Sequence, residues 1–167
     1  MTRNAYSTAQ QLLHWATFGL FVVQLWTYPA IGRTHHAAHL GETVSENDLL
    51  LHNVHAISGG IILVFALTRL WLRHRAPVAS PVYPWPVLAT FARVVHLTLY
   101  ATLVFLPITG VLKMYVLSAA GPVHIFLTRI LYGLLVLHIA GALLHVAVWR
   151  DNLLARMGIK LPYQQRL

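Results

Sequence analysis

The sequence predicts an all-α integral membrane protein, built as an up-down-up-down bundle of four transmembrane helices. Hydrophobic residues make up 57% of the 167-residue chain and charged residues only 10%, with a mean hydropathy of +0.64. Soluble domains rarely show such a balance. Four apolar stretches, about 8–31, 47–73, 87–117 and 122–149, are each long enough to cross a bilayer. We expect residues 1–167 to form a single membrane domain.

The first two spans carry signals for the start of a helix. Ser7 and Gln10 fit a capping box, in which each side chain bonds the backbone of the other residue. Ser45 can cap the second span, with Asp48 in its first turn, where a negative charge suits the helix dipole. Both helices are therefore expected to begin close to these residues.

Prolines mark the other boundaries. The stretch from Ala76 to Pro86 contains four prolines, so we expect a stiff, non-helical connector there. Pro122 suits the first position of the last helix. Pro107 lies inside the third span, where Thr109 and Gly110 are expected to accompany a kink.

Basic residues are distributed unequally between the two ends of the expected bundle. Four spans place both termini on one side, here called inner, and most basic residues fall on or near it: Arg3, Arg69, Arg73, Arg75, Arg93, Arg150, Arg156, Lys160 and Arg166. Arg33, Lys113 and Arg129 fall on the opposite, outer side. For a multi-pass protein with four spans, the positive-inside rule then predicts that both termini lie in the cytoplasm. Because these charges flank spans, the pI of about 10.5 indicates contact with membrane lipid and no nucleic-acid partner.

Missing residue types exclude several classes of site. The sequence has no cysteine, which excludes thiolate zinc sites, cysteine-ligated iron–sulfur clusters, covalent c-type haem and disulfides. The acids Glu42, Glu46, Asp48 and Asp151 lie outside the apolar part of the spans, whereas cation transporters usually need an intramembrane carboxylate. A histidine-lined divalent-metal transporter is therefore disfavoured, and any metal must be held by histidine, methionine or oxygen.

Three histidines of the last span share one helical face. His124, His138 and His145 stand fourteen and then seven residues apart, and about 100° per residue returns them to one stripe. His124 and His138 are then separated by roughly 21 Å along the axis. One helix can therefore present imidazoles near both faces of a bilayer core about 30 Å thick, which suits one haem at each level.

The second span supplies a partner for His124 at the outer end. His55 and His124 both lie within about a turn of the outer ends of their helices, so they can share one iron. His52 lies one turn before His55 and is an alternative ligand. Bis-histidine ligation from facing helices is a natural way for a helical bundle to hold haem.

The inner end contains more histidines than one haem requires. His14, His96, His138 and His145 lie within reach of one another. Spacing alone permits either His14 or His96 as the partner of His138, and it does not decide between them.

Short motifs follow one another along nearly the whole chain. They are Tyr6-Ser7 with Gln10 and His14-Trp15, Asn53-x-His55 with Arg69-Leu70-x-x-Arg73, His96-Leu97 with Tyr100 and Leu106-Pro107-x-x-Gly110, and Leu137-His138 with His145 and Trp149-Arg150-Asp151-Asn152. As a set these motifs resemble the bacterial cytochrome b561 family, which is related to the membrane cytochrome subunits of hydrogenases. The resemblance implies a four-helix inner-membrane protein with two haems b, and some members oxidise superoxide and pass the electron to ubiquinone.

Carried over position by position, the family pattern implies roles for six histidines. It matches four of them to iron, one pair for each haem: His55 with His124 outside, and His14 with His138 inside. It leaves His96 and His145 for a quinone pocket, where an imidazole can bond a quinone carbonyl and supply a proton. The alternative is that His96 or His145 ligates the inner haem.

Several charged residues near these sites have expected roles. Arg69, Arg73 and Arg93 are candidates for the inner haem propionates or the rim of the quinone pocket, because guanidinium pairs well with carboxylate. For Arg73, snorkelling to the interface is the simpler explanation. Lys113 and Arg129, with the outer histidines, can attract an anion toward the outer haem edge.

The first outer connection contains His35, His36 and His39 ahead of Glu42. The i, i+3 and i, i+4 spacing of these histidines would suit a transition metal on a helical turn. A solvated polar loop is the expected structure.

Taken with the family resemblance, these features predict an oxidoreductase of the superoxide oxidase type. It would move electrons from a periplasmic one-electron donor, superoxide in the first place, to ubiquinone. The alternative is a cytochrome b electron-transfer subunit that anchors a periplasmic redox or lipid-binding partner, with the outer loop from Arg33 to Asp48 as the interface. Activity of the isolated chain favours the enzyme, and co-purification with a partner favours the subunit.

Overall fold

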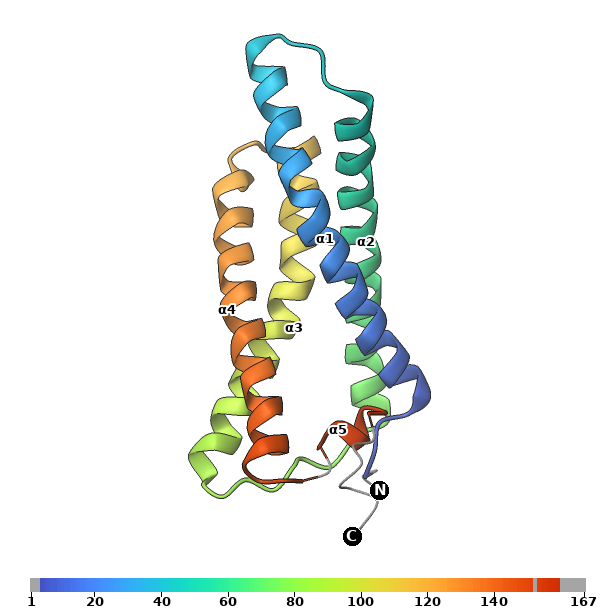
Figure 1. The fold of residues 1–167 in the computed structure, drawn as a ribbon, viewed down its shortest axis with the longest axis vertical. Coiled ribbons are helices and arrows are strands. Elements are labelled where there is room, and N and C mark those ends of the chain that lie inside the picture. The colour runs from blue at the N-terminus through green and yellow to red at the C-terminus, as the bar shows by residue number, and fades with distance from the viewer. Residues whose placement is uncertain (1–3, 152, 160–167) are drawn as a thin grey trace.

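The computed structural model describes residues 4–151 and 153–159, and its long elements are four helices. The helices are α1 (Thr8–Leu40), α2 (Glu46–Arg75), α3 (Pro86–Tyr115), α4 (Ala120–Ala147) and the short α5 (Leu153–Arg156). Figure 1 shows the four long helices running up and down along one axis, which confirms the predicted up-down-up-down bundle. Arg3, Asn152, Lys160 and Arg166, which entered the charge count or the last motif, lie outside the described residues.

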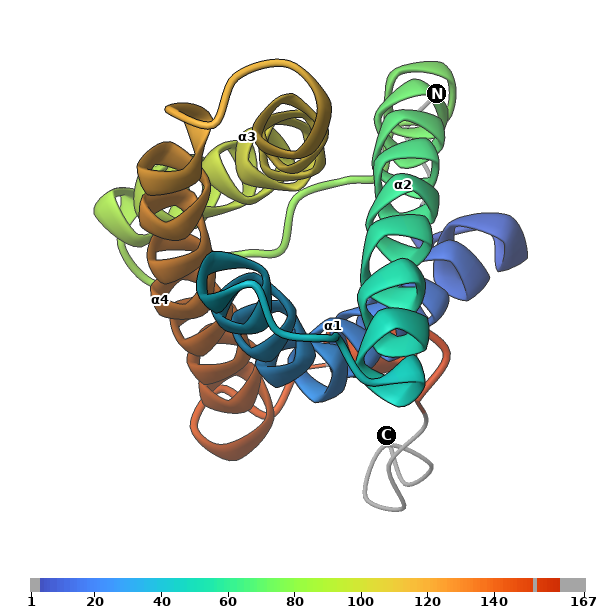
Figure 2. The ribbon, with the colours of Figure 1, turned by 90° about the horizontal axis from the view of Figure 1, so that it is seen from above.

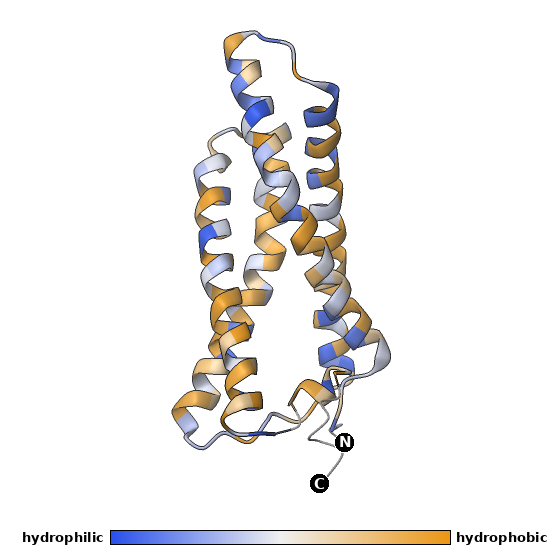
Figure 3. Ribbon diagram, viewed as in Figure 1, coloured by the Kyte–Doolittle hydropathy of each residue, from blue (hydrophilic) through white to orange (hydrophobic). Residues whose placement is uncertain are grey.

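The helices carry their apolar side chains on the outside. Within the described residues, α2, α3 and α4 are each long and apolar enough to cross a membrane. α1 has 33 residues and is less apolar, since polar residues such as Gln10 and Gln24 interrupt it. Figure 3 shows hydrophobic residues concentrated along the middle of the bundle, and large exposed side chains include Trp26, Val64 and Val136. This surface suits lipid, and the chain is a multi-pass membrane protein.

Both predicted helix starts are confirmed. The Gln10 backbone N–H donates to Ser7 Oγ at 3.3 Å, and the Ser7 N–H donates to Gln10 Oε1 at 2.9 Å, which completes the capping box of α1. At α2, the Asp48 N–H donates to Ser45 Oγ at 3.2 Å. The caps satisfy backbone donors that have no partner inside the helix.

The prolines have the expected effect in the connector but not at the start of the last helix. The chain from 76 to 85 is not helical, as predicted, and α3 begins at Pro86. The expected start of the last helix at Pro122 is wrong by two residues, because α4 begins at Ala120. A proline in the first turn removes no helical hydrogen bond, so the helix can start before it. α3 continues through Pro107.

The first helix is longer than its apolar segment. α1 runs to Leu40 and ends at Gly41, which has a φ of 68° in the left-handed region. The expectation of a polar loop at His35, His36 and His39 is therefore wrong, since these histidines lie on the last turns of α1. The segment contains the good helix formers Ala37 and Ala38, and the next strong stop signal is the glycine. α1 and α2 consequently form a hairpin that reaches beyond the outer ends of α3 and α4 (Figure 1).

The helices pack mainly as two pairs. α1 packs along α2 and α3 along α4, while α2 and α3 share a smaller contact. In the described part of the chain, the backbones of α1 and α4 make no close contact, although Figure 2 shows all four helices arranged around one axis. The tightest apolar cluster, Val95, Leu99 and Leu131, lies on α3 and α4. Leu131 lies between His124 and His138 along α4, and Val95 is next to His96 on α3.

Candidate functional site

The first outer histidine, His55, is held by a threonine of the neighbouring helix. Its Nδ1 lies 3.0 Å from Thr27 Oγ1. The Thr27 hydroxyl, which is fully buried, donates its own proton to the Val23 carbonyl at 2.8 Å. Thr27 Oγ1 must therefore accept the proton on His55 Nδ1, which leaves the lone pair of His55 Nε2 available to a metal.

The second outer histidine, His124, is held by the Leu106-Pro107-x-x-Gly110 motif of α3. Its Nδ1 lies 3.0 Å from the Leu106 carbonyl oxygen and 3.1 Å from Thr109 Oγ1. The Thr109 hydroxyl donates to the same carbonyl at 2.8 Å, so both oxygens act as acceptors for His124. A Cβ added at Gly110 would lie 3.2 Å from Cε1 of this ring. Gly110 thus makes room for an imidazole whose Nε2 is also left for a metal.

The two outer histidines come from helices whose backbones are not in close contact. Among the described residues, α2 and α4 make no close backbone contact, yet His55 and His124 interact electrostatically. His52, the alternative ligand, is bonded in the same way as His55, since its Nδ1 lies 2.9 Å from Thr34 Oγ1. Its ring lies beside His35, with 5.8 Å between the ring centroids. His52 is therefore part of the outer hairpin, one turn farther out than His55.

The inner end brings three of the predicted histidines together. The ring of His138 on α4 is close to two others, with centroid distances of 6.1 Å to His14 on α1 and 5.1 Å to His96 on α3. An imidazole nitrogen binds a transition metal at about 2 Å, so two rings on opposite sides of one metal have centroids roughly 6 Å apart. The spacing of His14 and His138 matches this value, and that of His96 and His138 is shorter.

The hydrogen bonds of the inner histidines instead favour His96 as the partner of His138. His96 donates from Nδ1 to the Ala92 carbonyl at 2.6 Å, which leaves its Nε2 free to ligate. Nδ1 of His14 instead lies 3.0 Å from a terminal nitrogen of Arg69, which can only donate. The His14 proton is therefore on Nε2, and ligation through Nε2 requires Arg69 to release Nδ1.

Arg69 and Arg73 gather around one aromatic ring at the inner end. Both guanidinium groups lie over Tyr100, at 5.6 Å and 5.8 Å from its centroid. Arg73 thus contacts Tyr100 beside Arg69, whereas snorkelling to the interface requires no such contact. Arg93 is exposed on α3 and makes no hydrogen bond or ring contact with this cluster in the part of the chain that the structure describes.

The second predicted quinone residue, His145, belongs to a separate cluster. It is buried at the inner end of α4, with its ring 4.4 Å from Trp149 and 5.3 Å from Tyr83, centroid to centroid. Its Nδ1 is bonded to Asp151 Oδ2. No ring contact joins it to His96 within the described residues, so the two predicted quinone residues belong to separate clusters.

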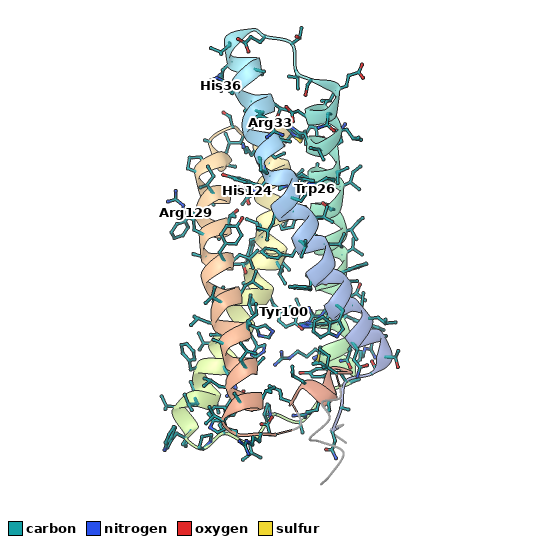
Figure 4. All side chains as sticks on the ribbon, viewed as in Figure 1. Trp26, Arg33, His36, Tyr100, His124 and Arg129 are labelled. Carbon is teal, nitrogen blue, oxygen red and sulfur yellow. The ribbon has the colours of Figure 1, made fainter. Side chains whose placement is uncertain are left out.

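The outer charges differ in their placement. Lys113 interacts electrostatically with His35, His52, His55 and His124. In Figure 4, by contrast, Arg129 points away from the bundle. No group of three metal-binding side chains is found among the described residues, so the idea of a metal on the helical turn of the outer histidines receives no support.

Sequence reasoning missed the residues that orient the histidines. Thr27 and Thr34 on α1, Thr109 on α3 and Asp151 after α4 each bond Nδ1 of one imidazole. A weak signal was present, because the two α1 threonines are seven residues apart and so lie on one helical face. Which histidine each one meets depends on the packing of α1 against α2.

The outer donor set, His55 and His124, fits a pair of residues that would hold a haem. Both Nδ1 protons are directed to oxygen acceptors, the supporting arrangement found around metal-bound imidazoles. The donors come from helices kept apart, and Gly110 gives His124 its space. At the inner end the ring spacing of His14 and His138 also fits a shared metal, provided that Arg69 releases Nδ1 of His14.

Comparison with known proteins identifies the family of the chain. The family model described as prokaryotic cytochrome b561 matches residues 5–159. A protein of Yersinia pestis named probable superoxide oxidase CybB is 28% identical over 127 residues, covering 62% of this chain and 72% of the relative. Cytochrome b561 homolog 1 of Escherichia coli (strain K12) is 28% identical over 179 aligned residues, covering 92% and 97%. Membership of the prokaryotic cytochrome b561 family implies that a protein binds haem b. Because the family match spans nearly the whole chain, the protein belongs to this family of membrane electron-transfer proteins.

Proposed function

We propose that the protein moves electrons from a one-electron donor on the outer side, superoxide in the first place, to ubiquinone, and that it holds two haems b to do so. The observation that carries this proposal is the pair of histidine sets at the two ends of one bundle. At the outer end, His55 and His124 already have the hydrogen bonds of ligating imidazoles. At the inner end, His14 and His138 have the ring spacing of a ligand pair.

Four side chains would hold the two groups. His55 and His124 would ligate the outer haem, and His14 and His138 the inner one. Bound there, the haems supply the one-electron chemistry that links a one-electron donor with a two-electron acceptor. Arg69, once it releases His14, is placed to pair with a carboxylate, which is the partner its planar guanidinium prefers.

The donor side is proposed to favour a small anion. Lys113 is a cation that interacts with four of the outer histidines, on α1, α2 and α4. A positive field near a reaction centre raises the arrival rate of an anion. The name of the Yersinia pestis relative, probable superoxide oxidase, supports superoxide as that anion.

The acceptor side is proposed to lie at the inner end. His96 and His145 both lie in clusters at this end, and both have Nδ1 engaged with an oxygen acceptor. Each Nε2 atom can then exchange a hydrogen bond or a proton with a quinone oxygen. We further propose that the chain crosses the bacterial inner membrane four times, with both termini in the cytoplasm, because most basic residues lie at this end.

Rapid mixing of the oxidised haem-loaded protein with superoxide tests the function. The absorption spectrum should change to that of reduced haem, and a soluble ubiquinone should then be reduced. Superoxide dismutase should prevent both changes. Lys113→Ala should slow the superoxide step and weaken its dependence on ionic strength, whereas Arg129→Ala should leave the rate unchanged. Haems that stay oxidised on mixing would overturn superoxide as the donor.

A second candidate function is an electron-transfer subunit for a periplasmic partner. The α1–α2 hairpin reaches beyond α3 and α4 (Figure 1), and it holds a hollow of about 470 Å³ beside the Arg33–Asp48 ion pair. Such a protruding surface suits a protein contact. Co-purification of a redox protein from native membranes, lost when residues 36–44 are replaced by a short glycine-serine linker, would favour this function. Superoxide-driven quinone reduction by the isolated chain would count against it.

A further inference from the structure

The inner end of the bundle holds a carboxylate bonded to a buried imidazole. Asp151 Oδ2 accepts a hydrogen bond from His145 Nδ1. The His145 side chain is only 3% exposed, whereas that of Asp151 is 34% exposed. The pair therefore connects the aqueous side of the inner end with the interior of the bundle.

The backbone is bent to make this contact. α4 ends at Ala147, and Arg150 has a φ of 50°, in the left-handed region that residues other than glycine rarely adopt. The bend lets the Asp151 N–H donate to the His145 carbonyl at 3.1 Å, while Asp151 Oδ1 accepts from the Leu153 N–H at 3.0 Å. A backbone in a rarely populated conformation is retained where its surroundings or its function require it. Here it fixes a carboxylate against a buried ring.

The surroundings leave one atom of the pair unused. Trp149 and Tyr83 pack on the His145 ring, and burial raises the pKa of the Tyr83 phenol, which keeps it neutral. In the described residues, His145 Nε2 makes no hydrogen bond, although the ring is almost fully buried. Tyr6 from the N-terminal segment and Arg156 from α5 also act electrostatically on Tyr83, and Arg150 directly precedes Asp151 in the chain. A buried, unpaired imidazole nitrogen calls for a polar ligand.

We propose that Asp151 is a positioning residue for quinone reduction, which holds His145 in the Nδ1–H tautomer and stabilises its protonated form. This inference rests on the proposed quinone acceptor. Full reduction of one quinone takes up two electrons, which the donor supplies, and two protons. For each proton delivered by His145, its Nε2–H bond breaks as an O–H bond forms on the quinone, and the neutral imidazole regains a proton from water on the inner side.

The role of the carboxylate is electrostatic as well as geometric. A negative charge on Nδ1–H makes an imidazolium accessible inside an apolar bundle, and it prevents the ring from turning its Nε2 away. An amide at position 151 can donate to Nδ1 and so favours the opposite tautomer. We expect Asp151→Asn to lower the limiting rate of quinone reduction by about 100-fold, within the range of general acid catalysis. The quinone concentration for half-saturation should change much less.

Haem reoxidation isolates this step from the outer donor. The haem-loaded protein is reduced chemically and mixed with a soluble short-chain ubiquinone across about pH 5 to 9, a range that brackets histidine titration. The alkaline fall in the rate should move to lower pH in Asp151→Asn, and Asp151→Glu should restore the rate in part. Glu46→Gln, which removes a carboxylate at the outer end, is the matched control and should behave as wild type.

Nitrogen NMR of the histidine rings gives a second measurement that needs neither turnover nor quinone. His145, assigned by comparison with His145→Gln, should show the Nδ1–H tautomer in the wild type and lose it in Asp151→Asn. A wild type that quinone cannot reoxidise would overturn the proposed acceptor. A wild type that quinone reoxidises, with an Asp151→Asn variant of the same rate and pH profile, would overturn the role of Asp151 alone. Should Asp151→Asn fail to fold, the wild-type tautomer decides, and an Nε2–H ring contradicts the proposal.

Discussion

The hydroxyl of Thr27 accepts the Nδ1 proton of His55 across the interface of α1 and α2, at 3.0 Å. The Leu106 carbonyl on α3 does the same for His124 at the same distance. The two imidazoles of the outer site are thus oriented by different helices with different acceptors. Both keep Nε2 for a ligand, so the protein's packing prepares the outer site.

Removing the Thr27 hydroxyl should loosen the outer haem. Thr27→Val keeps the shape of the side chain but leaves His55 Nδ1 without its acceptor, and loss of such a partner typically weakens metal affinity about 10-fold to 100-fold. Haem retained after dilution into apomyoglobin measures the effect. Thr102→Val is the matched control, because Thr102 is also buried and its hydroxyl bonds carbonyls of its own helix. Equal haem retention in the two variants would contradict the role of Thr27.

Gly110→Ala should disturb His124 directly. The added Cβ would lie 3.2 Å from Cε1 of the ring, which is tighter than ordinary contacts, so the ring has to move. We expect the low-spin signal of the outer haem to change in electron paramagnetic resonance while that of the inner haem stays. Gly133→Ala on α4 meets no neighbour within 4 Å and should leave both signals intact. An unchanged outer signal in Gly110→Ala would show that His124 does not ligate.

Much of the architecture could be predicted, because hydropathy and capping act locally. The four long helices and the caps at Ser7 and Ser45 followed from apolar runs and from side chains three residues from their partners. The end of α1 did not, since a helix can continue past its apolar segment until a residue such as Gly41 stops it. An apolar run measures the lipid-facing length, and it does not define the helix.

The site was predictable only in part, for a related reason. Residue types and depth identified the six histidines, but their partners lie far apart in sequence, as with Thr27 and His55. Such contacts depend on the register between packed helices. At the inner end His14 and His96 occupy one level beside His138, and only ring spacing and hydrogen bonds distinguish them.

Separate substitutions should identify the partner of His138 at the inner haem. We expect His14→Ala and His138→Ala each to abolish the inner low-spin signal, because the spacing of these two rings fits a shared metal. His96→Ala and His145→Ala should retain both haems and impair quinone reduction. Electron paramagnetic resonance with haem quantification makes the comparison. Loss of the inner signal in His96→Ala, with retention in His14→Ala, would reverse the assignment in favour of the hydrogen-bonding pattern.

Arg156 should stabilise the inner end without taking part in electron transfer. Its guanidinium donates to the Asn4 carbonyl at 2.7 Å and to the Ala79 carbonyl, so it joins the N-terminal segment, the α2–α3 connector and α5. We expect Arg156→Ala to lower the free energy of unfolding by about 1.5–3 kcal/mol, the range for hydrogen bonds to a charged group. Denaturant unfolding in detergent measures this, with Arg129→Ala as the exposed control. Equal unfolding midpoints in the two variants would refute the connection.

The haem content of the isolated chain tests the central claim most directly. A reduced-minus-oxidised spectrum with a pyridine haemochrome assay should give two b haems per chain in the wild type and one in His138→Ala. A colourless protein, or a wild-type stoichiometry near one haem per chain, would contradict the assignment of two histidine pairs.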